Sequence, residues 1–224
     1  MKKVFPLLLI IIATASFMKH EKKHTLLCLG DSYTIGEAVL EKERFPMQAT
    51  ALLKKKNIQF EKPVIIAKTG WTTNELTKAI EQQNLKLKFD FVTLLIGVNN
   101  QYRERDTENY RSEFRALLIT AIDYADGKRN HVVVISIPDW GVTPFGYNDK
   151  RGEKKIREEI DLFNAINKEE ALKAKVNYID ITPHSRNAKT DEDLIAGDGL
   201  HPSGKMYEEW AEKLAENIEQ KITR

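Results

Sequence analysis

Short apolar runs alternate along this chain with longer segments in which apolar residues recur every three or four positions. The short runs are rich in Val, Ile, Leu and Phe, which is typical of strands buried on both faces. Five such runs predict strands at residues 25–29, 63–67, 89–96, 131–137 and 176–179. The longer segments have the period of an α-helix with one buried face. They predict helices at residues 44–56, 72–84, 107–124, 154–175 and 203–222.

This alternation defines the fold class. Strands separated by helices form a parallel sheet, because the chain crosses a face of the sheet between successive strands. Right-handed crossovers then place helices on both faces. We therefore predict a single three-layer α/β/α domain with a five-stranded parallel sheet over residues 25–224. In such sheets ligands bind beyond the carboxyl ends of the strands, where this chain has long loops.

The N-terminus has a different pattern. Lys2 and Lys3 precede an apolar run over residues 4–13, and the small residues of Ala13-Thr14-Ala15 resemble a cleavage site. This order predicts a signal peptide at residues 1–15, a polar segment at 16–24, and a periplasmic or extracellular protein. The apolar run, at most about 14 residues, is shorter than the roughly 20 that span a membrane. We expect no stable membrane span after cleavage; an uncleaved membrane anchor is the alternative.

Composition and charge exclude several classes of protein. The 224 residues are 42% hydrophobic and 30% charged, which is typical of a folded domain with a full core. A single cysteine, Cys28, excludes an intrachain disulfide and a cysteine-rich zinc site. The net charge of +2 gives no electrostatic case for nucleic acid as a partner.

Two loops carry the residue types of nucleophilic catalysis. Gly30-Asp31-Ser32 directly follows the first predicted strand, so Ser32 is placed at the edge of the sheet. Taken alone, this tripeptide is also typical of a turn, or of a loop that binds phosphate or flavin. Near the other end, Asp198 and His201 are three residues apart, so one tight turn brings carboxylate and imidazole together. A serine nucleophile needs such a base and such an orienting carboxylate.

Two further loops supply donors for an oxyanion. Gly70 follows the second predicted strand, and Asn99 follows the third. A glycine lets its N–H approach a ligand closely, and an asparagine side chain is an uncharged donor. Each residue alone is typical of a turn, but four strand-end loops that together present Ser, Gly, Asn and Asp/His favour acyl transfer. Asp198 and His201 do not complete a metal site, and we expect no metal.

With these motifs in this order, the sequence resembles the SGNH hydrolases, the superfamily of GDSL-type esterases and lipases. Ser32 matches the nucleophile, whose N–H also joins the oxyanion hole. Gly70 and Asn99 match the other two oxyanion donors, and Asp198 and His201 match the rest of the triad. The resemblance implies a flavodoxin-like fold with strand order 2-1-3-4-5. Asn100 stands where the family usually has aspartate, and we expect a changed loop hydrogen bond without loss of the mechanism.

The expected activity is that of a secreted serine esterase that forms an acyl-enzyme and needs no cofactor. Its substrate would be a small-molecule, polysaccharide or lipid ester. Aromatic residues on the strand-end loops could stack on sugar rings, as in a carbohydrate acetylesterase. They could equally line an acyl pocket, as in a lysophospholipase or thioesterase. These residues are Trp71, Tyr102, Trp140, Phe145 and Tyr147. Two alternatives are a catalytically inactive ligand-binding or surface protein on the same fold and a flavodoxin-like cofactor protein.

Overall fold

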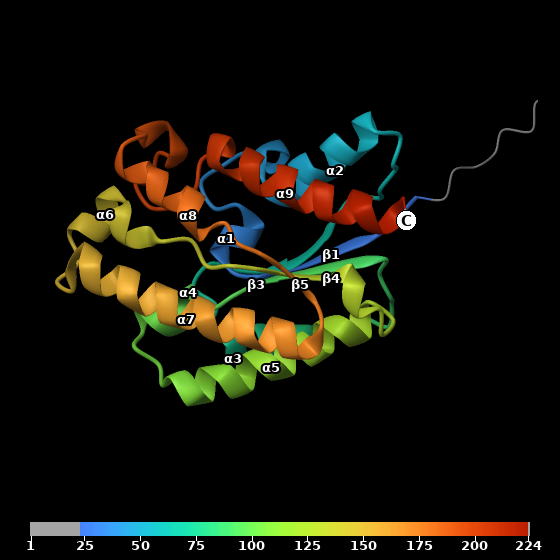
Figure 1. Cartoon of the computed structure of the whole chain (residues 1–224), viewed down its shortest axis with the longest axis horizontal. Coiled ribbons are helices and arrows are strands. Elements are labelled where there is room, and N and C mark those ends of the chain that lie inside the picture. Colours follow the sequence, from blue (N-terminus) through green and yellow to red (C-terminus); the bar gives the residue numbers. More distant parts are fainter. Residues whose placement is uncertain (1–22, 224) are drawn as a thin grey trace, which may run out of the picture.

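Five parallel strands, apolar on both faces, form the centre of the molecule. The computed structural model describes residues 23–223 and is drawn in Figure 1. The strands are β1 (Leu26–Gly30), β2 (Val64–Ala67), β3 (Phe91–Leu95), β4 (Val132–Ile135) and β5 (Asn177–Ile179). They pair in the order β2-β1-β3-β4-β5, and every pairing is parallel. The α/β fold class and the strand order that the resemblance implies are therefore confirmed.

Long helices cover both faces of this sheet (Figure 1). One face carries α2 (Phe45–Lys55) and α9 (Gly204–Ile222), which pack on each other. The other face carries α3 (Thr73–Gln83), α5 (Thr107–Tyr124) and α7 (Gly152–Ala174). These five helices correspond to the five predicted ones, and the bounds of α5 are those that the pattern predicts.

Short helical segments occupy the loops and were not predicted. Four are α-helical turns: α1 (Ser32–Ile35), α4 (Val98–Tyr102), α6 (Pro144–Tyr147) and α8 (Thr182–Ser185). Five are 3-10 turns: η1 (Glu41–Glu43), η2 (Arg129–His131), η3 (Trp140–Val142), η4 (Arg186–Lys189) and η5 (Glu192–Leu194). A segment of three to five residues is too short to show a helical period, so hydrophobic patterning does not detect it.

The predicted strands were too long where apolar residues continue past the ladder. Phe89 is buried, but its N–H donates to the carbonyl of Tyr124 at the end of α5 and not to a neighbouring strand. His131 belongs to the turn before β4, where its ring stacks on Phe91 with centroids 4.6 Å apart. Burial sets the apolar pattern, whereas backbone pairing sets the strand bounds, and the two differ at these ends.

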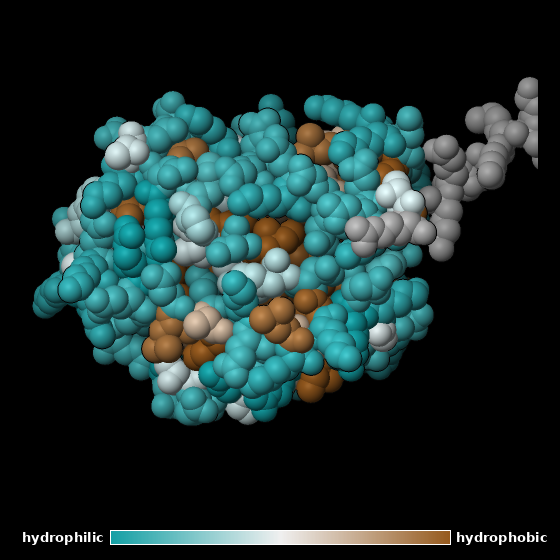
Figure 2. Space-filling model, viewed as in Figure 1, coloured by the Kyte–Doolittle hydropathy of each residue, from teal (hydrophilic) through white to brown (hydrophobic). Residues whose placement is uncertain are grey.

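The region N-terminal to residue 23, which includes the predicted signal peptide, lies outside the described residues. Within residues 23–223, no helix has both the length and the apolar character needed to cross a bilayer. Figure 2 shows that the face over α9 and α7 is mainly hydrophilic, with scattered apolar residues. Two of the exposed apolar side chains belong to α7, Leu162 and Leu172.

An aromatic cluster fixes α9 against α2. The fully buried ring of Trp210 lies 6.2 Å from Phe45 and 5.0 Å from Tyr207, measured between ring centroids. Tyr33, which follows the predicted nucleophile, also contacts Trp210 at 6.4 Å. The cluster thus links the packing of α9 to the segment that carries Ser32.

We expect Trp210→Ala to lower the free energy of unfolding by about 3–5 kcal/mol, because it leaves a large cavity in a close-packed core. Urea unfolding followed by circular dichroism measures this loss. The matched control is Leu172→Ala on α7, whose side chain is exposed, and it should change stability by less than about 0.5 kcal/mol. Equal effects of the two substitutions would contradict this description of the core.

Candidate active site

Ser32 is held at the carboxyl end of β1 by a very tight turn. A Cβ atom on Gly30 would lie 2.1 Å from the Thr34 hydroxyl oxygen and 2.4 Å from the Leu95 carbonyl oxygen, so only glycine fits there. Asp31 caps α1 by accepting a 3.1 Å hydrogen bond from the N–H of Tyr33. Ser32 is therefore the first residue of α1, where N–H groups have no partner within the helix. Its N–H is available to a ligand.

Asp31 is adjacent to Ser32 but has a different role. Its carboxylate is fully buried, and one of its oxygens has no hydrogen-bond partner. Burial raises the pKa of Asp31 to about 7, although the N–H of Tyr33 opposes the shift. The contacts of Asp31 are those of a helix cap.

Asp198 and His201 form the pair that their spacing predicts. Asp198 Oδ2 lies 2.6 Å from His201 Nδ1, and Asp198 Oδ1 accepts 3.0 Å hydrogen bonds from the N–H groups of Leu200 and His201. Partial burial of Asp198 disfavours its charge, but these hydrogen bonds outweigh burial and hold its pKa below the usual value. The carboxylate thus holds the proton on Nδ1 and leaves Nε2 free to accept one.

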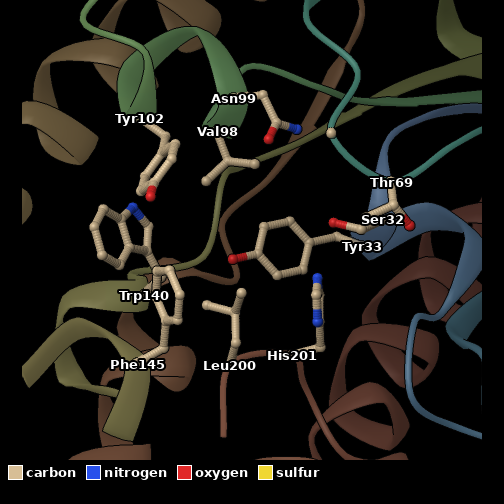
Figure 3. A pocket seen from close by; sticks show the side chains of 11 residues that line it. Ser32, Tyr33, Thr69, Val98, Asn99, Tyr102, Trp140, Phe145, Leu200 and His201 are labelled. Atoms are coloured by element: carbon tan, nitrogen blue, oxygen red, sulfur yellow. The ribbon is translucent and has the colours of Figure 1, made fainter. Parts of the chain in front are cut away.

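The imidazole of His201 points toward Ser32 in Figure 3, and both residues line the same pocket. The Tyr33 ring contacts the imidazole nearly edge-on, with centroids 5.7 Å apart. The carbonyl of His201 accepts a 2.8 Å hydrogen bond from Ala196, which fixes the loop. His201 and Ser32 are only 7% and 5% exposed, so their chemistry takes place largely out of water.

Gly70 and Asn99 lie on neighbouring loops that line the same pocket. Gly70 has a φ of +83°, in the left-handed region that favours glycine. One hydrogen of the Asn99 amide is donated to the Trp71 carbonyl at 2.9 Å. An amide has two such hydrogens, and in Figure 3 the amide nitrogen of Asn99 lies on the side of Ser32. The second hydrogen can therefore serve a ligand.

The helix α4 holds the Gly70 loop at several points. Besides the bond from Asn99, the Arg103 guanidinium donates to the Gly70 carbonyl at 2.6 Å. Buried Asn100 accepts from the Thr73 N–H at 3.0 Å and donates to the Thr73 hydroxyl at 2.7 Å. The second of these contacts requires an amide, because an aspartate could not donate it. Asn100 stands where the family that the sequence resembles usually has aspartate. We still predict that the mechanism is retained.

The pocket has a volume of about 170 Å³. It brings together Ser32, Gly70, Asn99 and His201, and its far end is lined by three predicted aromatic residues: Tyr102, Trp140 and Phe145. Trp71 does not line it. Position on a strand-end loop does not set the direction of a side chain, and the half-buried ring of Trp71 packs against the core.

Sequence reasoning did not single out four other lining residues: Tyr33, Thr69, Val98 and Leu200. All four are immediate neighbours of predicted site residues, which are Ser32, Gly70, Asn99 and His201. Adjacency within the motifs was therefore a usable signal. Among the described residues, no group of three or more His, Cys, Asp or Glu side chains is arranged to hold a metal ion.

We expect Arg103→Ala to lower kcat by about 10- to 100-fold with little change in KM, because a displaced Gly70 N–H weakens stabilisation of the transition state. Arg103→Lys should recover part of the loss by donating to the same carbonyl. Arg105→Ala is the matched control, since Arg105 is an exposed arginine on the same loop. Steady-state kinetics on an aryl ester measures the effect, and an unchanged kcat in Arg103→Ala would remove Arg103 from the site.

Comparisons with known proteins identify a family for most of this sequence. Residues 28–209 match the model of the GDSL-like lipase/acylhydrolase family. Among curated proteins, no sequence matched. A lipase/acylhydrolase from Enterococcus faecalis is structurally similar, with a TM-score of 0.67 and 19% identity over 88% of this chain and 96% of the other.

Two esterases are similar as well. The acetylxylan esterase Axe2 from Geobacillus stearothermophilus has a TM-score of 0.65 and 19% identity over 87% of this chain and 94% of its own. The esterase EstA from Pseudoalteromonas sp. has a TM-score of 0.63 and 14% identity over 90% of this chain and 100% of its own. At such identities the structures show a shared fold, whereas the family match covers most of the sequence. This chain belongs to the GDSL-like lipase/acylhydrolase family.

Proposed function

We propose that this protein is a serine esterase that hydrolyses carboxylic esters through an acyl-enzyme. The observation that carries the proposal is the convergence of Ser32, Gly70, Asn99 and His201 on one pocket, with Asp198 bound to the imidazole. These side chains come from four separate loops. A turn or a helix cap would explain each residue singly but not their convergence.

The proposed reaction has two steps. In the first, Ser32 Oγ attacks the ester carbonyl while His201 Nε2 takes its proton; the proton then passes to the departing alcohol. In the second, His201 takes a proton from water, the hydroxide attacks the acyl-enzyme, and Ser32 regains its proton as the acid leaves. Asp198 orients the imidazole and stabilises its positive charge in both steps.

The oxyanion of each tetrahedral intermediate would be stabilised by the N–H groups of Ser32 and Gly70 and by the Asn99 side chain. Donors of this kind act strongly when they are fixed before the reaction begins. The hydrogen bonds from α4 to the Gly70 loop support that role, because they fix two of the three donors relative to each other.

Export is a second part of the proposal, and it rests on the sequence of residues 1–15 alone. The mature protein should begin near Ser16 and be recovered from the periplasm or the medium. N-terminal sequencing of the protein from fractionated cells tests this, and an intact N-terminus on cytosolic protein would contradict it.

We expect Ser32→Ala and His201→Ala each to lower kcat by about 10⁴-fold or more. The double variant should be hardly worse, because the two residues act as a unit.

A fluorophosphonate should label Ser32 in the natural protein and should not label it in His201→Ala. Substantial turnover by Ser32→Ala would contradict the mechanism, and an unlabelled, inactive natural protein would favour a binding role.

Asn99→Ala should lower kcat by about 10²- to 10³-fold, because one oxyanion donor is lost. The substitution also removes the bond to the Trp71 carbonyl, so stability is measured in parallel. We expect a loss of about 1 kcal/mol in the free energy of unfolding. If kcat is unchanged, Asn99 has no part in the oxyanion hole.

A further inference from the structure

The pocket continues beyond the reacting groups into a hydrocarbon-lined end. Figure 3 shows Ser32 and His201 at one side of the pocket, with Tyr102, Trp140 and Phe145 grouped at the other. Val98, Leu200 and the ring of Tyr33 lie between them. A substrate whose carbonyl is at Ser32 thus has an apolar region beside it, in which a further part of the molecule can be bound.

Few polar atoms in this pocket remain for a sugar. The Thr69 hydroxyl donates to Glu37, and the Trp140 indole N–H donates to Gln101 at 2.8 Å. Apart from the reacting groups, the hydroxyls of Tyr33 and Tyr102 are the side-chain polar atoms of this pocket that have no hydrogen bond within the described part of the chain. A site selective for a sugar ring must pair several hydroxyls, because each one buried without a partner costs binding free energy.

The three rings form a wall and not a flat stacking platform. They are tilted against one another, with centroids 5.5 Å apart for Tyr102–Trp140, 6.2 Å for Tyr102–Phe145 and 5.8 Å for Trp140–Phe145. Trp140 is only 2% exposed. The Arg151 guanidinium lies 5.3 Å from the ring centroid of Tyr102 and 5.1 Å from that of Trp140. Tyr102 and Phe145 are 45% and 42% exposed, but their rings are tilted by 46° against each other and so do not offer one flat face to a pyranose.

Hydrogen bonds and ion pairs hold this wall in place. Gln101, which accepts from the Trp140 indole, donates in turn to Glu159 on α7 at 2.7 Å. Asp139, which precedes Trp140, accepts from the Gly141 N–H at 3.0 Å and from Arg186 at 2.8 Å. The apolar end is therefore formed before a substrate arrives, which is typical of a small-molecule site.

The whole pocket, including the space beside Ser32 and His201, is small. An apolar cavity of about 150 Å³ accepts a benzene molecule in a protein interior. The 170 Å³ here is of that size. We propose that this end of the pocket binds the acyl chain of the substrate, and that the enzyme prefers straight-chain acyl groups of about four to eight carbons. The inference rests on the proposed function and names the substrate class of that same site.

The test compares p-nitrophenyl esters from acetate to palmitate on the full chain, with each kcat/KM corrected for spontaneous hydrolysis. Each methylene that the pocket buries is worth about fourfold. We expect a maximum near hexanoate, about tenfold or more above acetate, and a fall toward palmitate, whose chain exceeds the pocket. An acetylated xylooligosaccharide serves as the competing substrate and should react more slowly than the hexanoate.

Phe145 is the residue through which to change the preference. It lies on α6 and is partly exposed, so its removal should not unfold the protein. Phe145→Ala lengthens the pocket and should raise the decanoate-to-hexanoate ratio of kcat/KM by about fivefold or more, mainly through KM. Phe145→Trp should move the maximum toward butyrate. Tyr147→Ala is the matched control, because Tyr147 is on the same short helix, is 55% exposed and does not line the pocket.

Two kinds of failure are distinguishable. Three results would contradict the acyl pocket: a maximum at acetate or palmitate, a chain-length profile that Phe145→Ala leaves unchanged, or faster deacetylation of the xylooligosaccharide. None of them would contradict the serine esterase mechanism. Two other results would contradict both the proposed function and this inference: Ser32→Ala still hydrolyses the p-nitrophenyl esters, or the natural protein hydrolyses none of them.

Discussion

The register of the three strands at the β2–β1–β3 side of the sheet determines where the candidate chemistry lies. Gly30 at the end of β1 pairs with Ala67 on β2 and with Leu95 on β3. Ser32, Gly70 and Asn99 follow these three paired residues by two, three and four positions, respectively. Because the strands are parallel, their carboxyl ends coincide, and the three loops must meet. A shift in this register would separate Ser32 from Gly70 and Asn99.

Strand register alone does not set the orientation of the donors. That depends on α4, which bonds to two consecutive carbonyls of the Gly70 loop and to both polar groups of Thr73. The same short helix carries Val98 and Tyr102, which line the pocket. One short helix thus carries one proposed oxyanion donor, Asn99, and two residues that line the pocket, so the proposed binding of an acyl group could be coupled to the placement of its carbonyl.

The long elements and the convergence of the motif residues on one pocket could be predicted from sequence, because burial imposes a period and the motif residues have fixed spacing. The Asp198–His201 contact followed from a separation of three residues. The short helices could not be predicted, and the contact of Arg103 with Gly70 was missed for the same reason. Arg103 is four residues from Asn99, and this spacing places the two on one side of the chain only because α4 is helical. Trp71 shows the other limit, since backbone position gives no side-chain direction.

The central claim is that an acyl group passes through Ser32. The most direct measurement is mass spectrometry of the protein quenched in acid during turnover of an activated ester, followed by peptide mapping. The account predicts a mass increase of one acyl group on the peptide that contains Ser32, and its disappearance as the substrate is exhausted. Turnover without any acylated intermediate, or with acylation confined to another residue, would contradict it.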